Sequence, residues 1–364
     1  MPASLIDAPR LPTVRDVALR RRESGAGGLP DAEQRGDGAA YQEVVCRSAL
    51  NRVQGMPFAW TLNPYRGCTH GCHYCFARRY QSQLEMDAGG EFSSVILVKV
   101  NFPEVLRREL IRKPRAGERA AFGTATDPYQ PIEGSYRLTR RALEALVERP
   151  MRVDLVTRGP LIVRDMDLLT ELSRTAACTV SFSVPTTDEE AWRRLEPGTA
   201  HPLQRLRALA KLAAAGVDAG VLMAPIVPGI SSAPAKLEAT VRAVADHGAR
   251  FVGGGLLHLE GGARAHFLEF LDREYPELSA GYRRLYAGKH PAPRYAEQVL
   301  AMLGGLQARY GLARRQGRRP EAAAPADGRP PQPPLRQRRF DWRDRRTTPA
   351  GPAVRSAARS AGGC

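Results

Sequence analysis

The feature that most constrains the fold is an alternation of short apolar runs with amphipathic segments between about residue 93 and residue 259. The apolar runs are rich in Val, Ile and Leu, which is typical of strands buried on both faces of a parallel sheet. The segments between them carry apolar residues at helical spacing. Strands are predicted at 93–101, 119–127 (strand, then loop), 151–157, 178–184, 217–225 and 249–259, and helices at 102–113, 136–148, 164–175, 201–215 and 234–247.

This alternation predicts an α/β fold in which right-handed crossovers join parallel strands. A further strand is expected in FAWTLN, directly before a group of cysteines. A count of about six strands is smaller than the eight of a closed barrel, so we predict a partial, open, six-stranded TIM-like βα barrel. Functional groups in such folds lie at the carboxyl ends of the strands. The polar candidates at those ends are 124–127, 157–158, 181–183, 224–225 and His258.

The two ends of the chain differ from this central domain, which we place at residues 41–312. Residues 1–40 are polar, rich in glycine and without a clear period, so they are predicted to be disordered. Order is expected to begin with a short helix near 44–53. Residues 313–364 are rich in Pro and Arg and are also predicted to be disordered, because such a segment cannot bury enough apolar surface to offset its ordering entropy.

More than half of the net charge of +16 lies in this tail. From Arg314 to Cys364, 13 Arg stand against 4 acidic residues, so the segment alone carries +9. A basic disordered segment can hold nucleic acid through the phosphates. It can equally be a solubilising tail without a specific partner. The charge leaves both interpretations open.

The sequence shows neither a membrane-spanning run nor a secretory signal. No stretch of about 18 apolar residues is present, and such a stretch is needed to cross a bilayer. The N-terminus lacks an apolar signal core. We therefore expect a cytoplasmic protein with no membrane partner. Six cysteines in 364 residues do not make a disulfide scaffold, and clustered cysteines in a reducing compartment are more often metal ligands or catalytic groups.

Three of the six cysteines, Cys68, Cys72 and Cys75, lie within eight residues of one another. Thiolates suit both iron–sulfur clusters and zinc. A closed zinc site needs four ligands, and His70 or His73 could supply the fourth. On a cubane cluster, three cysteines would instead leave one iron open to a cofactor or substrate. The position of the loop, after the strand that leads the βα series, favours the cluster.

The whole loop at 63–78, with the spacing Cys-x₃-Cys-x₂-Cys and Tyr74 before its last cysteine, resembles the signature of radical S-adenosylmethionine (SAM) enzymes. The resemblance implies a 4Fe–4S cluster on Cys68, Cys72 and Cys75, with SAM bound to the open iron. It also implies reductive cleavage of SAM to a 5′-deoxyadenosyl radical that abstracts hydrogen from a substrate. A reducing partner such as flavodoxin or ferredoxin is implied as well, and Tyr74 would contact SAM near its adenine.

Longer strings, among them GTATDPYQPIE, LVTRGPLIVRD and SFSVPTTDEEAWRRLEPG, are similar to the spore photoproduct lyase group, often labelled DNA repair photolyase-like, and above all to its uncharacterised actinobacterial-type members. This resemblance places Thr126, Arg158 and Ser183 beside SAM. Arg158 stands where the lyase has a lysine, and either cation could pair with the SAM carboxylate. Thr124 replaces the cysteine that returns a hydrogen atom in the lyase. An O–H group is a poor hydrogen-atom donor, so thymine-dimer repair by the lyase route is not expected.

Two functions follow from these features. The first is a radical SAM enzyme, lyase-like or of unassigned reaction, acting on a substrate that no local motif names, with nucleic acid as one candidate class. The alternative is a zinc- or cluster-stabilised nucleic-acid-binding protein without radical chemistry. The βα series favours the enzyme, because a simple binding module does not need it. No catalytic residue is assigned, and Asp127 is interpreted as structural first.

Overall fold

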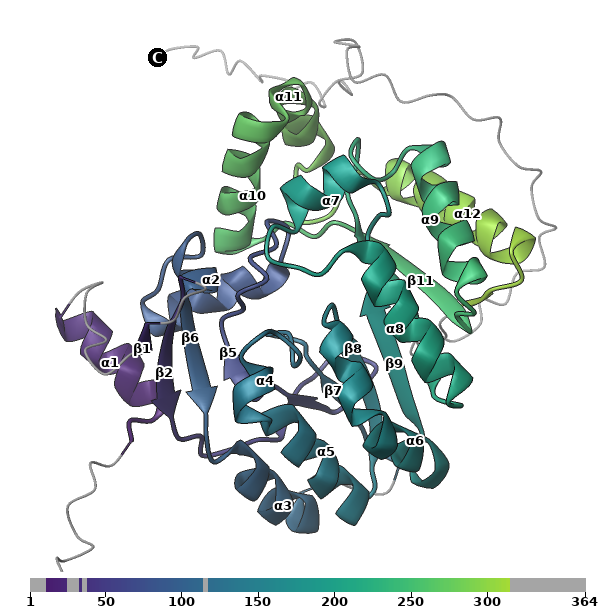
Figure 1. Cartoon of the computed structure of the whole chain (residues 1–364). Helices are drawn as coiled ribbons and strands as arrows, with labels where there is room; N and C mark the ends of the chain where they lie inside the picture. The colour runs from purple at the N-terminus through teal and green to yellow at the C-terminus, as the bar shows by residue number, and fades with distance from the viewer. Residues whose placement is uncertain (1–10, 25–32, 35–37, 114–116, 315–364) are drawn as a thin grey trace, which may run out of the picture. The chain divides into compact units, whose positions relative to one another are not determined.

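The computed structural model (Figure 1) describes residues 11–24, 33–34, 38–113 and 117–314. The chain divides into two units, Met1–Gly328 and Arg329–Cys364. All described residues belong to the first unit, and everything below concerns that unit. Apart from its first two residues, the predicted tail at 313–364 lies outside the described residues.

An eight-stranded sheet forms the frame of this unit. Its strands are β3 (Asn51–Arg52), β4 (Trp60–Leu62), β7 (Arg119–Phe122), β8 (Arg152–Thr157), β9 (Cys178–Ser183), β10 (Asp218–Ile226), β11 (Phe251–Leu256) and β12 (Ala313–Arg314). They lie in the order β12-β11-β10-β9-β8-β7-β4-β3, and all neighbours are parallel except β3 and β4. The predicted partial, open βα barrel is therefore confirmed. Six of its strands, β4 and β7 to β11, were expected, and the two-residue strands β3 and β12 are added at its two edges.

Helices fill the connections between these strands. They are α2 (Glu91–Ser94), α3 (Phe102–Arg112), α4 (Glu133–Tyr136), α5 (Leu138–Glu148), α6 (Met166–Thr175), α7 (Glu189–Leu195), α8 (Pro202–Ala214), α9 (Pro234–Asp246), α10 (Gly261–Glu274), α11 (Pro276–Leu285) and α12 (Pro293–Arg309), with 3₁₀ helices η1 (Phe76–Leu84) and η2 (Pro160–Asp165). In Figure 1, α5, α6 and α8 lie along one face of the strands. Within the described residues, no helix is both long enough and apolar enough to cross a membrane.

The register of the parallel strands sorts their side chains into two faces, because neighbouring residues of a strand point in opposite directions. Phe122, Leu155, Val180 and Ala219 are aligned across β7 to β10, and all are buried in the core under the helices. The preceding residue on each strand faces the interior of the barrel. These residues, with the aligned residue of β4, form one row: Thr61, Ala121, Asp154, Thr179 and Asp218. The barrel interior therefore has a polar row near the amino ends of its strands.

A second, four-stranded sheet stands beside the barrel. It contains β1 (Glu33–Gln34), β2 (Ala40–Val44), β5 (Tyr65–Arg66) and β6 (Val95–Lys99), in the order β1-β2-β6-β5. The segment predicted as a strand at 93–101 is thus a strand, but it pairs with β2 and β5 and not with the barrel. Local periodicity shows that a strand forms, whereas its pairing partner is decided by tertiary packing.

The N-terminal region corrects two predictions. Within the segment expected to be disordered, α1 (Val14–Ser24) is a helix. Its Val17 is buried with Val44, Leu84 and Leu97, so long-range apolar contacts stabilise a segment whose own composition does not indicate order. The short helix expected at 44–53 is also absent from the described residues, which form the end of β2, bends and β3 instead.

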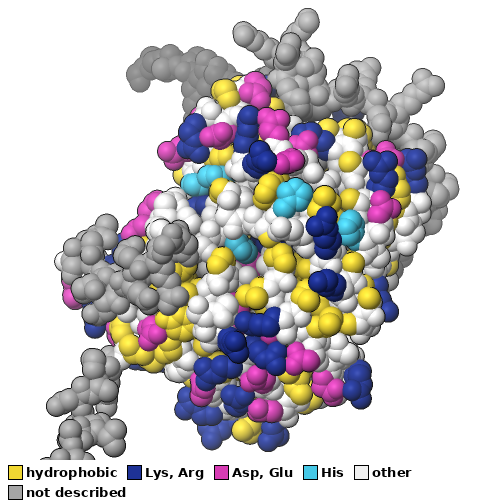
Figure 2. Space-filling model, viewed as in Figure 1, with side chains coloured by type: hydrophobic (Ala, Val, Ile, Leu, Met, Phe, Trp, Pro, Cys, Tyr) yellow, Lys and Arg dark blue, Asp and Glu magenta, His cyan; other side chains and the backbone are white. Residues whose placement is uncertain are grey.

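Charged side chains are mixed on the face shown in Figure 2, where Lys and Arg gather over α3 to α5 with Asp and Glu among them. Arg107 lies 3.0 Å from Glu148, and Arg140 lies 2.9 Å from Asp167. Such exposed pairs contribute little to stability. Both arginines of these pairs thus have a carboxylate partner.

Candidate active site

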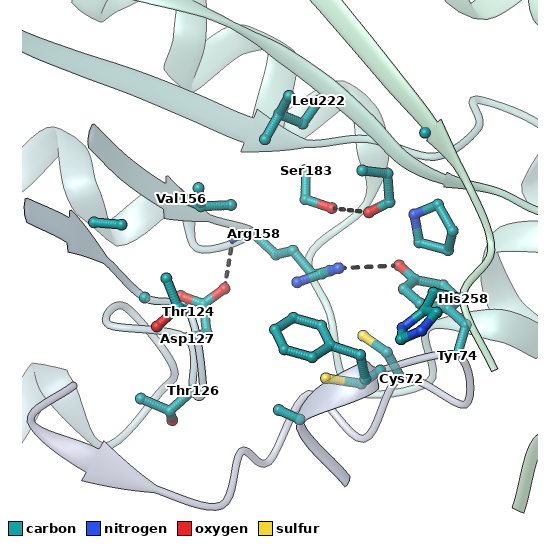
Figure 3. Close-up of a pocket in the computed structure, with 18 of the residues that line it drawn as sticks. Cys72, Tyr74, Thr124, Thr126, Asp127, Val156, Arg158, Ser183, Leu222 and His258 are labelled. Atoms are coloured by element: carbon teal, nitrogen blue, oxygen red, sulfur yellow. Dashed lines mark hydrogen bonds between the residues drawn. The ribbon is translucent and has the colours of Figure 1, made fainter. Parts of the chain in front are cut away.

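A cavity of about 700 Å³ begins at the carboxyl ends of the parallel strands and extends down into the barrel (Figure 3). The predicted polar positions that line it are Thr124, Thr126, Asp127, Arg158, Ser183, Ala224, Pro225 and His258, together with Cys68, Cys72, Tyr74 and Cys75. Thr157 and Ser181 are fully buried and are not part of the lining. The cavity therefore lies at the strand ends, as predicted. It brings together segments that are far apart in the sequence.

The cysteine loop begins where the chain leaves the large sheet for the small one, between β4 and β5. Gly67 follows β5 with a φ of +82°. A Cβ at this position would clash with the carbonyl oxygen of Val95, so glycine is required for both its conformation and its space. The backbone N–H of Cys68 then donates to the carbonyl of Phe92 at 2.9 Å. These contacts hold the first cysteine against β6 and α2.

Arg78 on η1 holds the rest of the loop. Its side chain is buried, and its guanidinium lies 4.7 Å from the centre of the Phe92 ring. The guanidinium donates hydrogen bonds to the carbonyls of Gly71 (2.6 Å), Cys72 (2.9 Å), Ala88 (2.7 Å) and Gly89 (2.6 Å). One buried side chain thus fixes the backbone between the cysteines. Sequence analysis did not select Arg78, because an Arg in an Arg-rich chain carries no local signal.

The three thiols present the donor set of a cluster site. Burial raises the pKa of Cys68 well above its usual value and that of Cys72 to about 12. Ionising them therefore needs nearby positive charge, which bound iron supplies. The described residues contain no three His, Cys, Asp or Glu side chains already arranged to hold a metal ion, so a cluster on these cysteines would require their thiols to turn toward a common point. Three thiols on one cavity wall fit a 4Fe–4S cluster with one open iron.

The two histidines of the loop have other partners. His70 Nδ1 lies 3.3 Å from Asp127 Oδ2. His73 Nδ1 lies 2.9 Å from His266 Nε2, and the His73 ring stacks on Phe270 with 4.3 Å between centroids. Burial lowers the pKa of both His73 and His266 to about 4, so both are neutral at neutral pH. These contacts hold both histidine rings within the loop.

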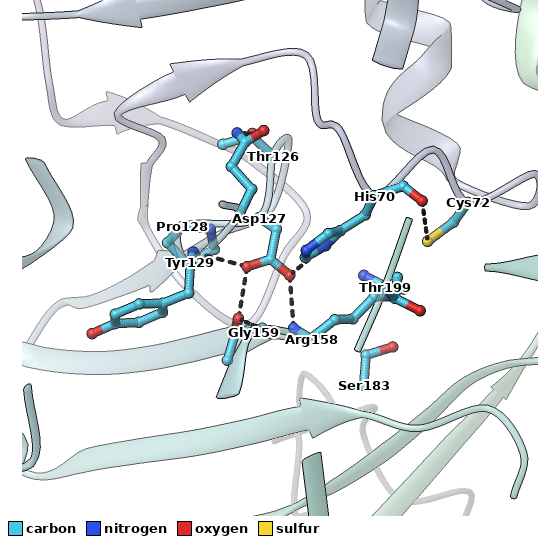
Figure 4. A network of polar contacts seen from close by, with 12 residues as sticks. His70, Cys72, Thr126, Asp127, Pro128, Tyr129, Arg158, Gly159, Ser183 and Thr199 are labelled. Atoms are coloured by element: carbon cyan, nitrogen blue, oxygen red, sulfur yellow. Dashed lines mark hydrogen bonds and ion pairs between the residues drawn. The ribbon is translucent and has the colours of Figure 1, made fainter. Parts of the chain in front are cut away.

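Asp127 joins the cysteine loop to the ends of two strands (Figure 4). Its carboxylate accepts hydrogen bonds from the Tyr129 backbone N–H (2.9 Å), the Thr157 hydroxyl (2.6 Å) and the Arg158 backbone N–H (2.7 Å). Burial alone would raise the pKa of Asp127, but His70 and the Thr157 hydroxyl outweigh it and hold the pKa at about 2. The carboxylate is therefore ionised, and its predicted structural role agrees with these contacts.

Glu196, at the end of α7, is the centre of a second buried network. Its Oε1 accepts from the Tyr74 hydroxyl and, at 3.1 Å, from Arg158 Nε, while Oε2 accepts from Arg205 Nη2 at 2.8 Å. The Arg158 guanidinium also lies 5.6 Å from the centre of the Tyr74 ring. Burial alone would raise the pKa of Glu196, but Arg205 and Arg158 hold it below its usual value. Two residues that sequence analysis did not assign thus bring together the two predicted SAM contacts.

The turn after α7 also lies directly on the cysteine loop. The backbone N–H of Gly198 donates to the His70 carbonyl at 3.1 Å, and the N–H of His73 donates to the Leu195 carbonyl at 3.0 Å. A Cβ at Gly198 would clash with the carbonyl oxygen of Thr69. The turn at 195–198 therefore adds two backbone hydrogen bonds to those that Arg78 makes with the loop.

Two threonines after β7 face the loop and the cavity. The Thr126 hydroxyl donates to the Gly67 carbonyl at 2.6 Å and accepts from Gln130 Nε2 at 3.0 Å. The Thr124 hydroxyl accepts from Asn63 Nδ2 at 3.2 Å. Thr126 was predicted to lie beside SAM, and its hydroxyl proton is directed at the backbone of the cysteine loop.

The remaining candidates lie on β9 and directly after β11. Ser183 Oγ is 3.5 Å from the carbonyl oxygen of Ala224 and lines the cavity. His258 also lines it and stacks on His290 with 4.7 Å between centroids, and burial lowers the pKa of His258. Cys178 is buried at the start of β9 and does not line the cavity. It therefore belongs to the core, as expected for a cysteine at the end of the strand away from the site.

Comparison with known proteins agrees with this geometry. The Radical SAM superfamily matches residues 62–241. An uncharacterized protein of Mycobacterium tuberculosis is 38% identical over 281 residues, which are 76% of this chain and 83% of that protein. An uncharacterized protein of Methanocaldococcus jannaschii is 25% identical over 258 residues, 71% of this chain and 91% of that protein.

A solved structure shares the fold. It is a mutant of spore photoproduct lyase with bound AdoMet and dinucleoside spore photoproduct. It matches with a TM-score of 0.59 and 16% identity, over 74% of this chain and 79% of that one. Taken with the cysteine loop at the head of the parallel strands, these matches show that the chain belongs to the Radical SAM superfamily.

Proposed function

We propose that this chain holds a 4Fe–4S cluster on Cys68, Cys72 and Cys75, cleaves SAM reductively and abstracts a hydrogen atom from a substrate in the cavity. The observation that carries the proposal is that the three cysteines line the same cavity as Tyr74 and Arg158. When bound, the cluster and SAM supply the radical chemistry. The protein supplies the positions of the groups and the exclusion of water.

The residues around the cavity have distinct parts in this proposal. Arg158 is fixed by its backbone bond to Asp127 and by its side-chain bond to Glu196, at 2.7 and 3.1 Å. A guanidinium held in this way is suited to pair with the SAM carboxylate. The ring of Tyr74, under the same guanidinium, would contact SAM near its adenine, and Ser183 would contact SAM from the end of β9.

Nucleic acid is the substrate class that we propose to test first. It draws support from the dinucleoside in the spore photoproduct lyase structure of the same fold. Return of hydrogen from a thiol is not part of the proposal, because Thr124 stands at that position. The cysteines that line the cavity in the described chain are the three of the loop. A flavodoxin- or ferredoxin-type partner would supply the electron.

The experiment is anaerobic reconstitution of the full chain with iron and sulfide. We expect a brown protein, an EPR signal from the reduced cluster, and 5′-deoxyadenosine after addition of SAM and dithionite. Cys72→Ala should lose all three. Cys178→Ala is the matched control and should keep them, because Cys178 is buried outside the cavity.

A colourless wild-type protein with one zinc per chain would overturn the proposal. It would favour the alternative, a zinc-stabilised nucleic-acid-binding protein that depends on its basic tail. A chain without residues 314–364 separates the two functions. Under our proposal this chain still cleaves SAM, while loose, salt-sensitive binding of nucleic acid is lost.

A further inference from the structure

The cavity has a polar floor, well below the cysteines. Arg119 at the start of β7 and Asp154 on β8 both line the cavity, and Arg119 Nη1 lies 3.1 Å from Asp154 Oδ2. The Asp154 side chain is only 11% exposed and that of Arg119 33% exposed. Thr61 of β4 lines the cavity in the same register row as Asp154. Charged groups inside a barrel are costly unless they are paired or serve a ligand.

The strand register fixes the depth of this floor. Asp154 is aligned with Thr179 of β9, and Ser183, at the level of the predicted SAM contacts, lies four residues further along the same strand. Four residues of a parallel strand rise about 13 Å. Between the two levels lies Val156 of β8, which lines the cavity. The space between floor and SAM level is therefore about as long as a small organic molecule.

This middle part of the cavity is largely apolar. Figure 3 shows Val156 and Leu222 on the wall that also carries Ser183 and Arg158. The opposite side is formed by the turn between β3 and β4 and by the start of η1. The apolar side chains there are Val53, Met56, Pro57, Phe58 and Phe76. Such walls favour a neutral, planar ring over a charged molecule.

We infer that this floor recognises a neutral ring with an amide-type edge, in which an N–H donor stands beside a carbonyl acceptor, as in lactams and imides. The Asp154 carboxylate would accept from the N–H, and the Arg119 guanidinium would donate to the carbonyl. An anion is disfavoured by Asp154 and a cation by Arg119. The inference deepens the proposed function and rests on it, because a ring anchored at the floor directs the rest of the substrate toward the cysteine level.

The test compares two probes on the full, reconstituted protein. 1-Methyluracil carries the N–H and carbonyl edge, whereas 1,3-dimethyluracil has the same ring without the donor. We expect ligand-observed NMR or calorimetry to show at least tenfold tighter binding of 1-methyluracil. Asp154→Leu should weaken its binding at least tenfold, and Arg119→Leu should do the same. Arg119 is the more exposed partner, so Arg119→Leu is expected to fold even if Asp154→Leu does not. Its binding of 1-methyluracil then decides the test.

Asp218→Leu is the matched control. Asp218 lies in the same register row, but it accepts a hydrogen bond from Thr179 at 3.1 Å and does not line the cavity. This variant should bind 1-methyluracil like the wild type. Equal binding of the two probes, or equal losses in Asp154→Leu and Asp218→Leu, would overturn the inference. If the same protein forms 5′-deoxyadenosine, only the inference about the floor is overturned, and the proposed function is retained. A protein that discriminates the probes but holds no cluster would overturn the proposed function alone.

Discussion

The cysteine loop and the open wall of the cavity, at Gly255 and Met56, are built in opposite ways. Around the cysteine loop, Arg78, Asp127 and Glu196 are buried, and each makes at least three hydrogen bonds or ion pairs. On the open side, a Cβ at Gly255 of β11 would meet no atom within 4 Å, and Met56 is 56% exposed. The cysteine loop is thus held by buried side chains of the protein itself, whereas the open wall has room for other side chains.

The largest effect should follow from Arg78→Ala, because this change removes the side chain that holds the cysteine loop. Four backbone carbonyls lose their donor, so we expect a loss of about 4 kcal/mol in the free energy of unfolding. Iron uptake on reconstitution should fall sharply. Denaturant titration of the apo protein and iron analysis measure the two effects.

Arg79→Ala is the control for this variant. Arg79 is 37% exposed and pairs with Glu260, which is 42% exposed, so its removal should change the free energy of unfolding by less than about 0.5 kcal/mol. Similar losses in the two variants would show that the cysteine loop is not held by the buried guanidinium.

Glu196→Gln should have the next largest effect. Arg158 and Arg205 would lose a buried carboxylate, which should cost about 3 kcal/mol of stability. SAM binding, followed by calorimetry on the reconstituted protein, should weaken about tenfold because Arg158 is released. Glu189→Gln, an exposed change on the same helix, should leave both quantities unchanged. Unaltered SAM binding in Glu196→Gln would separate Arg158 from the cofactor.

The contacts of Asp127 predict that the free energy of unfolding depends on pH. Its folded-state pKa of about 2 lies below the unfolded value of 3.8. The ionised carboxylate therefore stabilises the fold by about 2 kcal/mol above pH 4, and this contribution is lost as the pH falls toward 2. Unfolding free energies measured across this range should fall more steeply in the wild type than in Asp127→Asn. Parallel pH curves would contradict the assignment.

The smallest effect on stability should come from Gly255→Leu on the open wall, because a side chain at this position meets open space. Gly254 faces Leu303 of α12, so Gly255, its neighbour on the strand, faces the barrel interior. The free energy of unfolding should stay within about 0.5 kcal/mol of the wild-type value. SAM binding, measured by calorimetry on the reconstituted protein, should weaken, because the new side chain enters the cavity near the level of Ser183. Gly254→Ala should destabilise the fold through a clash with Leu303 and leave the cavity open. Unchanged SAM binding in Gly255→Leu would show that SAM does not reach this wall.

The position of the site could be predicted from the sequence, because strand periodicity is local and the strand-end rule then locates the functional edge. The three cysteines and Tyr74 needed no tertiary information, since they lie in one short loop. Other features depend on partners remote in the chain. Glu196 and Arg205 become a buried pair only after α7 and α8 fold over the loop. The strand at 95–99 was predicted, but its place in the small sheet was not, because pairing is not encoded locally.

The turn at 195–198 has a consequence for the order of events in synthesis. The cysteine loop is hydrogen-bonded to a segment that is made more than a hundred residues later, through the contact from Gly198 to His70. While the chain is still emerging from the ribosome, one side of the loop has no support. Contacts of such long sequence separation form late. Iron delivery should therefore follow synthesis of this turn, and staged cell-free translation that traps iron on nascent chains shorter than 195 residues would contradict this order.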